Sequence, residues 1–199
     1  MKILAFTDVH GDLSTLEHLK KEVKAKKIDY VVCIGDYTFF EQHIEFLTKK
    51  LAQLGTQVIL IHGNHEDNEV VEVLCKKYKN IHFIHKKIKK AGKYLFVGHG
   101  GGGFSLNDPD FVRTMKNLAK EFDNKKLILI THAPPNNTKL DYIPHYGHVG
   151  NRDYSKFIKE HNVVLALSGH LHETFGKEDK IGKTRLINPG YKGKIITLE

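Results

Sequence analysis

The first eighty residues alternate between short apolar runs and segments in which apolar residues recur at helical spacing. We expect strands at residues 2–7, 28–34 and 58–61, each followed by a helix, at residues 13–23, 39–54 and 66–78. Alternation of this kind is typical of a parallel sheet covered by helices. The chain therefore predicts an α/β fold.

The remaining residues continue with shorter elements. We expect strands at residues 81–84, 87–89, 94–97, 126–130 and 163–167, helices at 110–122 and 152–161, and a β-rich end at 173–199. Residues 133–150 carry Pro, Asn and Gly and predict a long loop, which in a compact domain is often functional. A chain of 199 residues, 40% of them hydrophobic, is expected to form a single domain over residues 1–199.

Composition excludes several classes of protein. No apolar run approaches the roughly 18 residues that a membrane span requires. The apolar stretch before Asp8 is too short for a signal peptide, so we expect a cytoplasmic protein without a membrane partner. Cys33 and Cys75 lie in apolar patterns and are interpreted as small core residues in a reducing compartment.

The net charge of +8 has two interpretations. It could attract a polyanion such as nucleic acid or a nucleotide. It could equally reflect a lysine-rich solvated surface, because the lysines cluster in helix-like stretches such as residues 20–27. Aromatic residues are not interleaved with the lysines, as a base-stacking surface would need, which favours the second interpretation.

Short polar motifs follow nearly all of the long apolar runs. They are Asp8-Val9-His10, Gly35-Asp36, Gly63-Asn64-His65-Glu66, Thr131-His132 and Gly169-His170-Leu171-His172. Open α/β sheets place ligand sites at the carboxyl ends of their strands. Residues i and i+2 of an extended chain point the same way, so we expect Asp8 and His10 to bind one cation. Adjacent residues point apart, so Asn64 and His65 should face different objects.

Each motif alone has an ordinary structural explanation. Asp36 could cap a helix, and a lone histidine after a strand is more often structural than a ligand. Together they favour a metal centre, because every strand predicted to be parallel ends in a His, Asp or Asn. Mixed imidazole and carboxylate ligands suit Zn, Fe, Mn or Ni better than Ca or Mg.

The ordered motifs, which span residues 8 to 172, resemble those of the calcineurin-like metallophosphoesterases. Three segments are similar to a small phosphodiesterase-like branch: Thr131-His132-Ala133-Pro134-Pro135, Gly147-His148-Val149-Gly150, and Gly169-His170-Leu171-His172-Glu173 with a later Asn188-Pro189-Gly190. The resemblance implies a four-layer α/β/β/α sandwich of two mixed sheets flanked by helices. The Val-Asp-Arg-Gly continuation typical of serine/threonine protein phosphatases is missing after Asp36.

The resemblance also implies how the residues divide. One divalent transition metal ion would take Asp8, His10, Asp36 and His172, and the other would take Asp36, Asn64, His132 and His170. His65 would contact the substrate, and a metal-bridging hydroxide would attack the phosphorus. The expected function is a dinuclear metal-dependent phosphohydrolase, most simply a phosphodiesterase for a small phosphoester that could be a nucleotide. The alternatives are a metal-binding protein-interaction scaffold and a nuclease.

Further residues have less definite roles. Asp12 could orient a ligand histidine or cap the helix that begins near Leu13, and we favour the cap. His148 and Arg152 flank a glycine turn of the long loop and could contact the substrate phosphate. His99 precedes the run of glycines at 100–103, which could approach phosphate through backbone amides or form a turn over the site. Neither the oligomeric state nor the physiological substrate follows from the sequence.

Overall fold

A computed structural model describes all residues, 1–199, and contains two large sheets. The first has the order β13-β1-β2-β3-β4, with β1 to β4 parallel and β13 antiparallel to β1. Its strands are β1 (Lys2–Phe6), β2 (Tyr30–Cys33), β3 (Gln57–Leu60), β4 (Ile81–Phe83) and β13 (Lys194–Thr197). The parallel strands confirm what the alternating pattern predicted.

The second sheet has the order β11-β12-β10-β7-β6-β5 and is parallel except at its two edges. Its strands are β5 (Lys87–Ala91), β6 (Tyr94–His99), β7 (Lys126–Thr131), β10 (Val163–Leu167), β11 (Glu178–Ile181) and β12 (Thr184–Ile187). An antiparallel strand at each edge makes this a mixed sheet, as expected.

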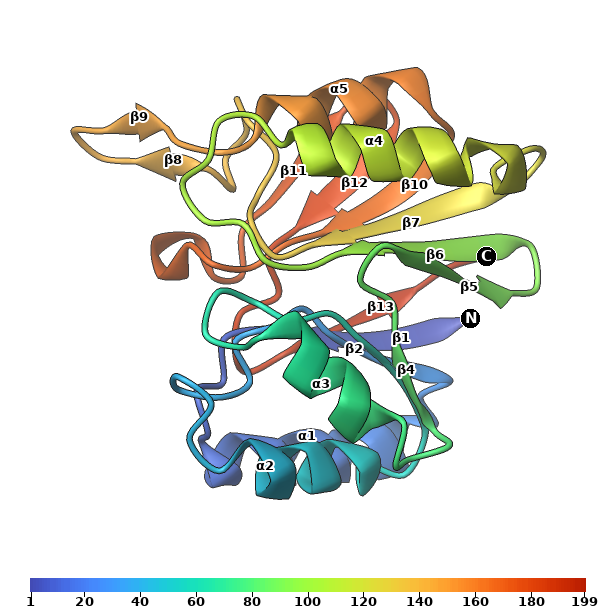
Figure 1. Cartoon of the computed structure of the whole chain (residues 1–199), viewed down its shortest axis with the longest axis vertical. Coiled ribbons are helices and arrows are strands. Elements are labelled where there is room, and N and C mark those ends of the chain that lie inside the picture. The colour runs from blue at the N-terminus through green and yellow to red at the C-terminus, as the bar shows by residue number, and fades with distance from the viewer.

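The sheets face each other, and helices cover their outer faces (Figure 1). The first sheet is covered by α1 (Leu13–Lys26), α2 (Ile44–Ala52) and α3 (Asn68–Cys75), and the second by α4 (Pro109–Leu118) and α5 (Arg152–Glu160). Alternation along β1 shows how the layers form. Ile3 and Ala5 pack between the sheets, whereas Leu4 and Phe6 pack against the helices. The four-layer α/β/β/α sandwich is thus confirmed.

Three local predictions need revision. The helix expected over residues 39–54 begins only at Ile44, because Phe40, Glu41 and His43 have positive φ angles of 46°, 60° and 56°. The third helix is shorter than expected, at Asn68–Cys75. The loop at 133–150 contains a small antiparallel hairpin of β8 (Tyr142–Ile143) and β9 (Gly147–His148), which projects beyond the second sheet (Figure 1).

Register brings the polar motifs to one edge of the molecule. Phe6, Cys33 and Leu60 are register partners at the ends of β1, β2 and β3. Ile130 and Leu167 are partners near the ends of β7 and β10. The chain therefore leaves neighbouring strands at the same level, on the same side of both sheets. Both cysteines are buried and free, and none of the helices is long and apolar enough to cross a membrane.

Candidate metal centre

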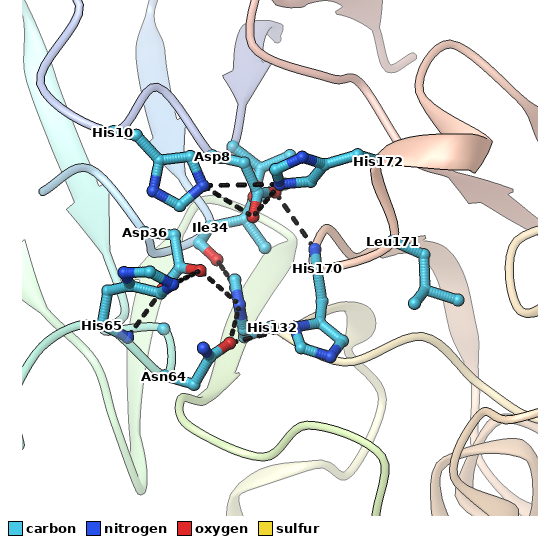
Figure 2. A network of polar contacts seen from close by, with 12 residues as sticks. Asp8, His10, Ile34, Asp36, Asn64, His65, His132, His170, Leu171 and His172 are labelled. Atoms are coloured by element: carbon cyan, nitrogen blue, oxygen red, sulfur yellow. Dashed lines mark hydrogen bonds and ion pairs between the residues drawn. The ribbon is translucent and has the colours of Figure 1, made fainter. Parts of the chain in front are cut away.

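Backbone conformation at the strand ends turns the predicted ligands toward one another. Asp8, His10, Asp36 and His170 all have left-handed φ angles, of 54°, 43°, 49° and 66°. Such angles cost about 1–3 kcal/mol at a non-glycine residue and persist only where the surrounding structure enforces them. The expectation that these motifs continue the extended strand was therefore wrong, although the residues do meet (Figure 2).

The first cluster contains Asp8, His10 and His172, whose ligand atoms all lie within 4.8 Å of one another. His172 Nε2 is 3.5 Å from Asp8 Oδ1, and His10 Nε2 is 4.0 Å from the same oxygen. The two histidine Nε2 atoms lie 3.4 Å apart. One carboxylate and two imidazoles thus converge on a single point.

The second cluster contains Asp36, Asn64, His132 and His170. His132 Nε2 lies 3.3 Å from Asp36 Oδ2 and 3.0 Å from Asn64 Oδ1. His170 Nδ1 is 2.9 Å from the same Asn64 oxygen. His170 and His172 are two residues apart but join different clusters, because His170 is left-handed and His172 begins a short 3₁₀ helix.

Asp36 lies between the clusters. It forms a compact group with His10 and His65, and another with Asp8 and His132. His65 Nε2 is 3.8 Å from Asp36 Oδ2, and the backbone N–H of His65 donates to Asp36 Oδ1 at 3.0 Å. Figure 2 shows Asp36 with His65 on one side and His132 on the other. This is the position that a shared carboxylate needs.

The hydrogen bonds of two histidines leave their inner nitrogens free for a cation. Nδ1 of His10 donates to the carbonyl of Thr38 at 3.1 Å, and Nδ1 of His132 donates to the carbonyl of Ile34 at 2.8 Å. In each ring Nε2 then faces the cluster, the orientation that a hydrogen bond from Nδ1 to a backbone carbonyl gives to metal-binding histidines. Asp8 Oδ1, which faces His10 and His172 in the first cluster, is buried without any hydrogen-bond partner. An unpartnered carboxylate oxygen at this place fits a divalent cation.

Charge in the metal-free centre is strongly coupled. Burial opposes ionisation of Asp36, but the hydrogen bond and charge of His132 lower its pKa to about 2. Burial likewise opposes the charge on His132, but Asp36 raises the pKa of His132 to about 9. Burial also opposes ionisation of Asp8, yet its contact with His172 lowers the pKa of Asp8. Both carboxylates are therefore ionised at neutral pH in the metal-free protein. Protonated His132 partly balances their negative charge, as a bound cation would.

His65 lies beside the clusters with its ring orientation defined. The backbone N–H of Phe40 donates to its Nδ1 at 3.3 Å, which leaves the proton on Nε2, toward Asp36. Burial lowers the pKa of His65, so its ring is neutral at pH 7 in the metal-free protein. The ring therefore presents an N–H to whatever lies over Asp36.

Glu66 has a structural role that the sequence analysis missed. It is 6% exposed, and its carboxylate accepts backbone N–H bonds from Asp36 at 3.0 Å, Thr38 at 2.8 Å and Gly63 at 2.9 Å. The Thr38 hydroxyl donates as well, at 2.8 Å. Glu66 thus fastens the loop after β2 to the loop after β3. The sequence did contain a signal for this role, because Glu66 directly follows predicted site residues and has no lysine or arginine close to it in the chain.

Glycines allow these loops to touch. A Cβ added to Gly63 would lie 2.0 Å from Asp36 Oδ1, and one added to Gly169 would lie 2.6 Å from Asp8 Oδ2. No side chain fits at either position while the carboxylates stay where they are. Gly63 and Gly169, which precede Asn64 and His170, are therefore required by close packing between strand ends.

The remaining sequence candidates have other contacts. Nδ1 of His148, on β9, lies 2.8 Å from Oδ1 of Asp141, the residue before β8, and none of the hydrogen bonds of His148 reaches the clusters. Arg152 begins α5, and its backbone N–H donates to the carbonyl of Leu106. Substrate binding by either residue stays a prediction. Asp12 accepts hydrogen bonds from the N–H groups of Ser14 and Thr15, which confirms it as the cap of α1.

The glycine run at 100–103 forms a turn over His62. The N–H of Gly101 donates to the carbonyl of His62 at 3.0 Å, and a Cβ on Gly100 would lie 2.5 Å from His62 Nδ1. His99 is held by Asp108, with 3.0 Å between Nε2 and Oδ2. Just beyond the run, the Phe104 ring lies 4.8 Å from the ring of His170. The segment therefore borders the second cluster.

Fold and paired clusters together define a metal-dependent phosphoesterase-like centre, and comparison with known proteins agrees. The family model described as calcineurin-like phosphoesterase matches residues 1–174. The chain belongs to this family.

A full-length relative and two solved structures extend the comparison. The uncharacterized protein MJ1162 of Methanocaldococcus jannaschii is 32% identical, and the match covers 98% of this chain and 91% of that protein. The structure of TT1561 of Thermus thermophilus has a TM-score of 0.78 at 20% identity and covers 95% of this chain and 88% of its own. A structure described as a novel archaeal phosphodiesterase has a TM-score of 0.54 at 16% identity and covers 96% and 84%. These two structures are similar in fold.

Proposed function

We propose that the chain is a dinuclear metal-dependent phosphodiesterase acting on a small phosphoester. One observation carries the proposal, namely that Asp36 lies between the two ligand clusters, grouped with His10 of the first and with His132 of the second. A carboxylate between two sets of imidazoles can bridge two cations. Membership of the calcineurin-like phosphoesterases supports a metal-dependent phosphoesterase.

The residues would divide as the resemblance implies. Asp8, His10, Asp36 and His172 would hold one divalent ion, and Asp36, Asn64, His132 and His170 would hold the other. When bound, two such ions supply a nucleophile at neutral pH and stabilise charge on phosphoryl oxygens. Imidazole and carboxylate donors favour Mn, Fe, Zn or Ni.

The chain's own groups contribute orientation and a proton donor. Backbone carbonyls of Ile34 and Thr38 hold two ligand histidines in the required tautomer. His65 presents Nε2–H beside Asp36 and would donate to the leaving oxygen of the substrate. Because burial lowers its pKa, the His65 ring is neutral in the metal-free protein and donates a hydrogen bond. Negative charge on a bound substrate would raise that pKa and favour the protonated ring, which can transfer a proton.

Preference for a diester rests on the lack of extra positive charge. No lysine or arginine forms a hydrogen bond or ion pair with any residue of the two clusters. A phosphomonoester carries nearly one more negative charge than a diester at neutral pH and gains more from such residues. Similarity to a structure described as an archaeal phosphodiesterase points the same way. We further propose a cytoplasmic location and a single domain over residues 1–199.

The test is hydrolysis of bis(p-nitrophenyl) phosphate after reconstitution with Mn²⁺, Fe²⁺, Zn²⁺ or Ni²⁺, with metal content measured by inductively coupled plasma mass spectrometry. We expect turnover that a chelator abolishes. Asp36→Ala should lose both metals, whereas His65→Ala should keep them and lower kcat by about 10²–10⁴-fold. Exposed Asp123→Ala and His18→Ala are the matched controls.

Three outcomes would contradict the proposal. Turnover that survives metal removal would exclude a metal-dependent reaction. Normal kcat in His65→Ala would exclude the role given to that residue. Two bound metals without turnover of any phosphodiester or monoester, together with a stably co-purifying protein, would favour the scaffold alternative instead.

A further inference from the structure

Exposed aromatic side chains border the metal clusters on two sides. Phe39 and Phe40 are 49% and 64% exposed, and their rings lie 5.4 Å and 4.2 Å from the ring of His65. Beside the second cluster, Phe104 is 65% exposed and its ring contacts the ring of His170. Large apolar groups exposed together beside a concave site mark a place where a ligand binds.

One of these phenylalanines lines a pocket that adjoins the first cluster. The pocket has a volume of about 380 Å³, within the size range of small-molecule sites. His10, a proposed metal ligand, forms one wall, and the exposed side chains Leu13, Phe39 and Phe46 form apolar walls. Polar Gln42 and His43 also line it. A molecule bound here would lie directly beside a phosphoryl group held at the clusters.

The irregular segment that forms this pocket is firmly held. Residues 39–43 replace the expected first turn of α2, with left-handed backbone at Phe40, Glu41 and His43. The N–H of Glu41 donates to the Thr38 hydroxyl at 3.2 Å, and Glu41 Oε1 accepts from the N–H of Asp67 at 2.8 Å. Strained backbone fixed in this way presents Phe39 in a defined place rather than in a loose loop.

We propose that the substrate carries a planar heteroaromatic group of the nucleobase type, which stacks on Phe39 in this pocket while the phosphate occupies the metal clusters. The inference rests on the proposed phosphodiesterase function and names its substrate class. Bases stack on aromatic side chains whatever their identity, because each has a π face. The Gln42 amide can donate to and accept from the polar edge of a base, which an alkyl chain lacks. Phe46 and Leu13 cover the remaining faces.

The first experiment compares methyl phosphate diesters with and without a nucleobase. Adenosine 5′-(methyl phosphate) and ribose 5-(methyl phosphate) share the same diester, and n-hexyl methyl phosphate tests a flexible apolar group. Steady-state rates would be followed by ³¹P NMR for the metal-loaded wild type, Phe39→Ala, Phe46→Ala and Phe39→Tyr. Val112→Ala is the control, because Val112 is 49% exposed, as Phe39 is, but lies on α4.

We expect each alanine variant to lose about tenfold in kcat/KM for the adenosine ester, equivalent to about 1.4 kcal/mol, mostly through KM. For the ribose ester, kcat/KM should change less than about twofold in the same variants. Phe39→Tyr should keep the wild-type kcat/KM for the adenosine ester, because its ring still stacks. Equal losses on the ribose ester would overturn the proposal, since the change would then be general damage. Equal losses on the hexyl ester would overturn the nucleobase and leave a general apolar pocket.

A second measurement separates this inference from the proposed function. Saturation-transfer NMR on the metal-free protein with adenosine, which has no phosphate, reports pocket binding without turnover. We expect transfer to the base protons in the wild type and its loss in Phe39→Ala and Phe46→Ala. If no phosphodiester is hydrolysed but this transfer occurs, the reaction is wrong and the pocket is right. Absence of transfer in the wild type, or equal transfer in the variants, would overturn the pocket.

Discussion

Replacement of Glu66 by glutamine should destabilise the protein although the two side chains have the same shape. The Glu66 carboxylate accepts two hydrogen bonds at each oxygen, from Asp36 and Gly63 at Oε2 and from the N–H and hydroxyl of Thr38 at Oε1. Burial raises the pKa of Glu66, and the Gly63 and Thr38 donors oppose that rise. Four donors require four acceptor sites, which only the ionised form has.

The magnitude follows from counting donors that lose their acceptor. A glutamine suffers least with its NH₂ toward Thr38, because the Thr38 hydroxyl can then accept while the Thr38 N–H is left unpaired. One buried unpaired donor costs about 1–3 kcal/mol, so we expect about 2 kcal/mol for Glu66→Gln. Glu66→Ala strands three backbone N–H groups and should cost about 3–5 kcal/mol.

Urea unfolding and thermal unfolding of the metal-free protein, both followed by circular dichroism, measure the two changes. For a chain of this size, 2 kcal/mol corresponds to about 4–8 °C in Tm. Glu69→Gln, an exposed glutamate on α3, is the control and should shift stability by less than about 0.5 kcal/mol. A Glu66→Gln variant as stable as the wild type would contradict this prediction, because it would mean that Glu66 is protonated or only fills space.

Three further predictions concern the neighbouring residues. The pKa of His132, about 9 when folded, exceeds the ordinary 6.5, so its stabilisation is complete below about pH 6.5 and is lost as pH rises through about 9. The urea midpoint of the metal-free protein should therefore fall above neutral pH, and His132→Asn should flatten that fall; an unchanged slope would contradict the ion pair. Gly63→Ala should displace Asp36 and lower bound metal at least tenfold by mass spectrometry, whereas full metal content would show that the loops can yield. Asp12→Ala should cost about 1 kcal/mol as a lost helix cap with metal content intact, and metal loss would instead make Asp12 an orienting residue.

Strand periodicity made most of the fold predictable. The apolar runs of β1, β2, β3, β7 and β10 are each two-sided and buried, so their positions were recovered within a few residues. The approximate position of the ligands followed, because polar residues directly after parallel strands share one edge of a sheet. The grouping into two clusters came from a family resemblance, and spacing alone would have paired His170 with His172.

Segments governed by distant contacts were not predictable in the same way. Residues 39–43 have helical apolar spacing, yet hydrogen bonds to Thr38 and Asp67 hold them in left-handed backbone. His148 looked like a free loop residue until the β8–β9 hairpin placed it against Asp141. In both cases the deciding partner comes from the tertiary arrangement, so local propensity is overridden.

The alternation of apolar runs with segments of helical spacing was enough to predict a parallel sheet whose carboxyl edge carries the polar residues. Periodicity is a local property, and burial of apolar faces follows from it directly. Only the folded chain shows that Glu66 joins the loops carrying Asp36 and Asn64, and that Phe39 lines a pocket beside His10. The physical reason is that left-handed backbone and close glycine contacts at the strand ends aim these side chains, and both depend on residues far away in the chain.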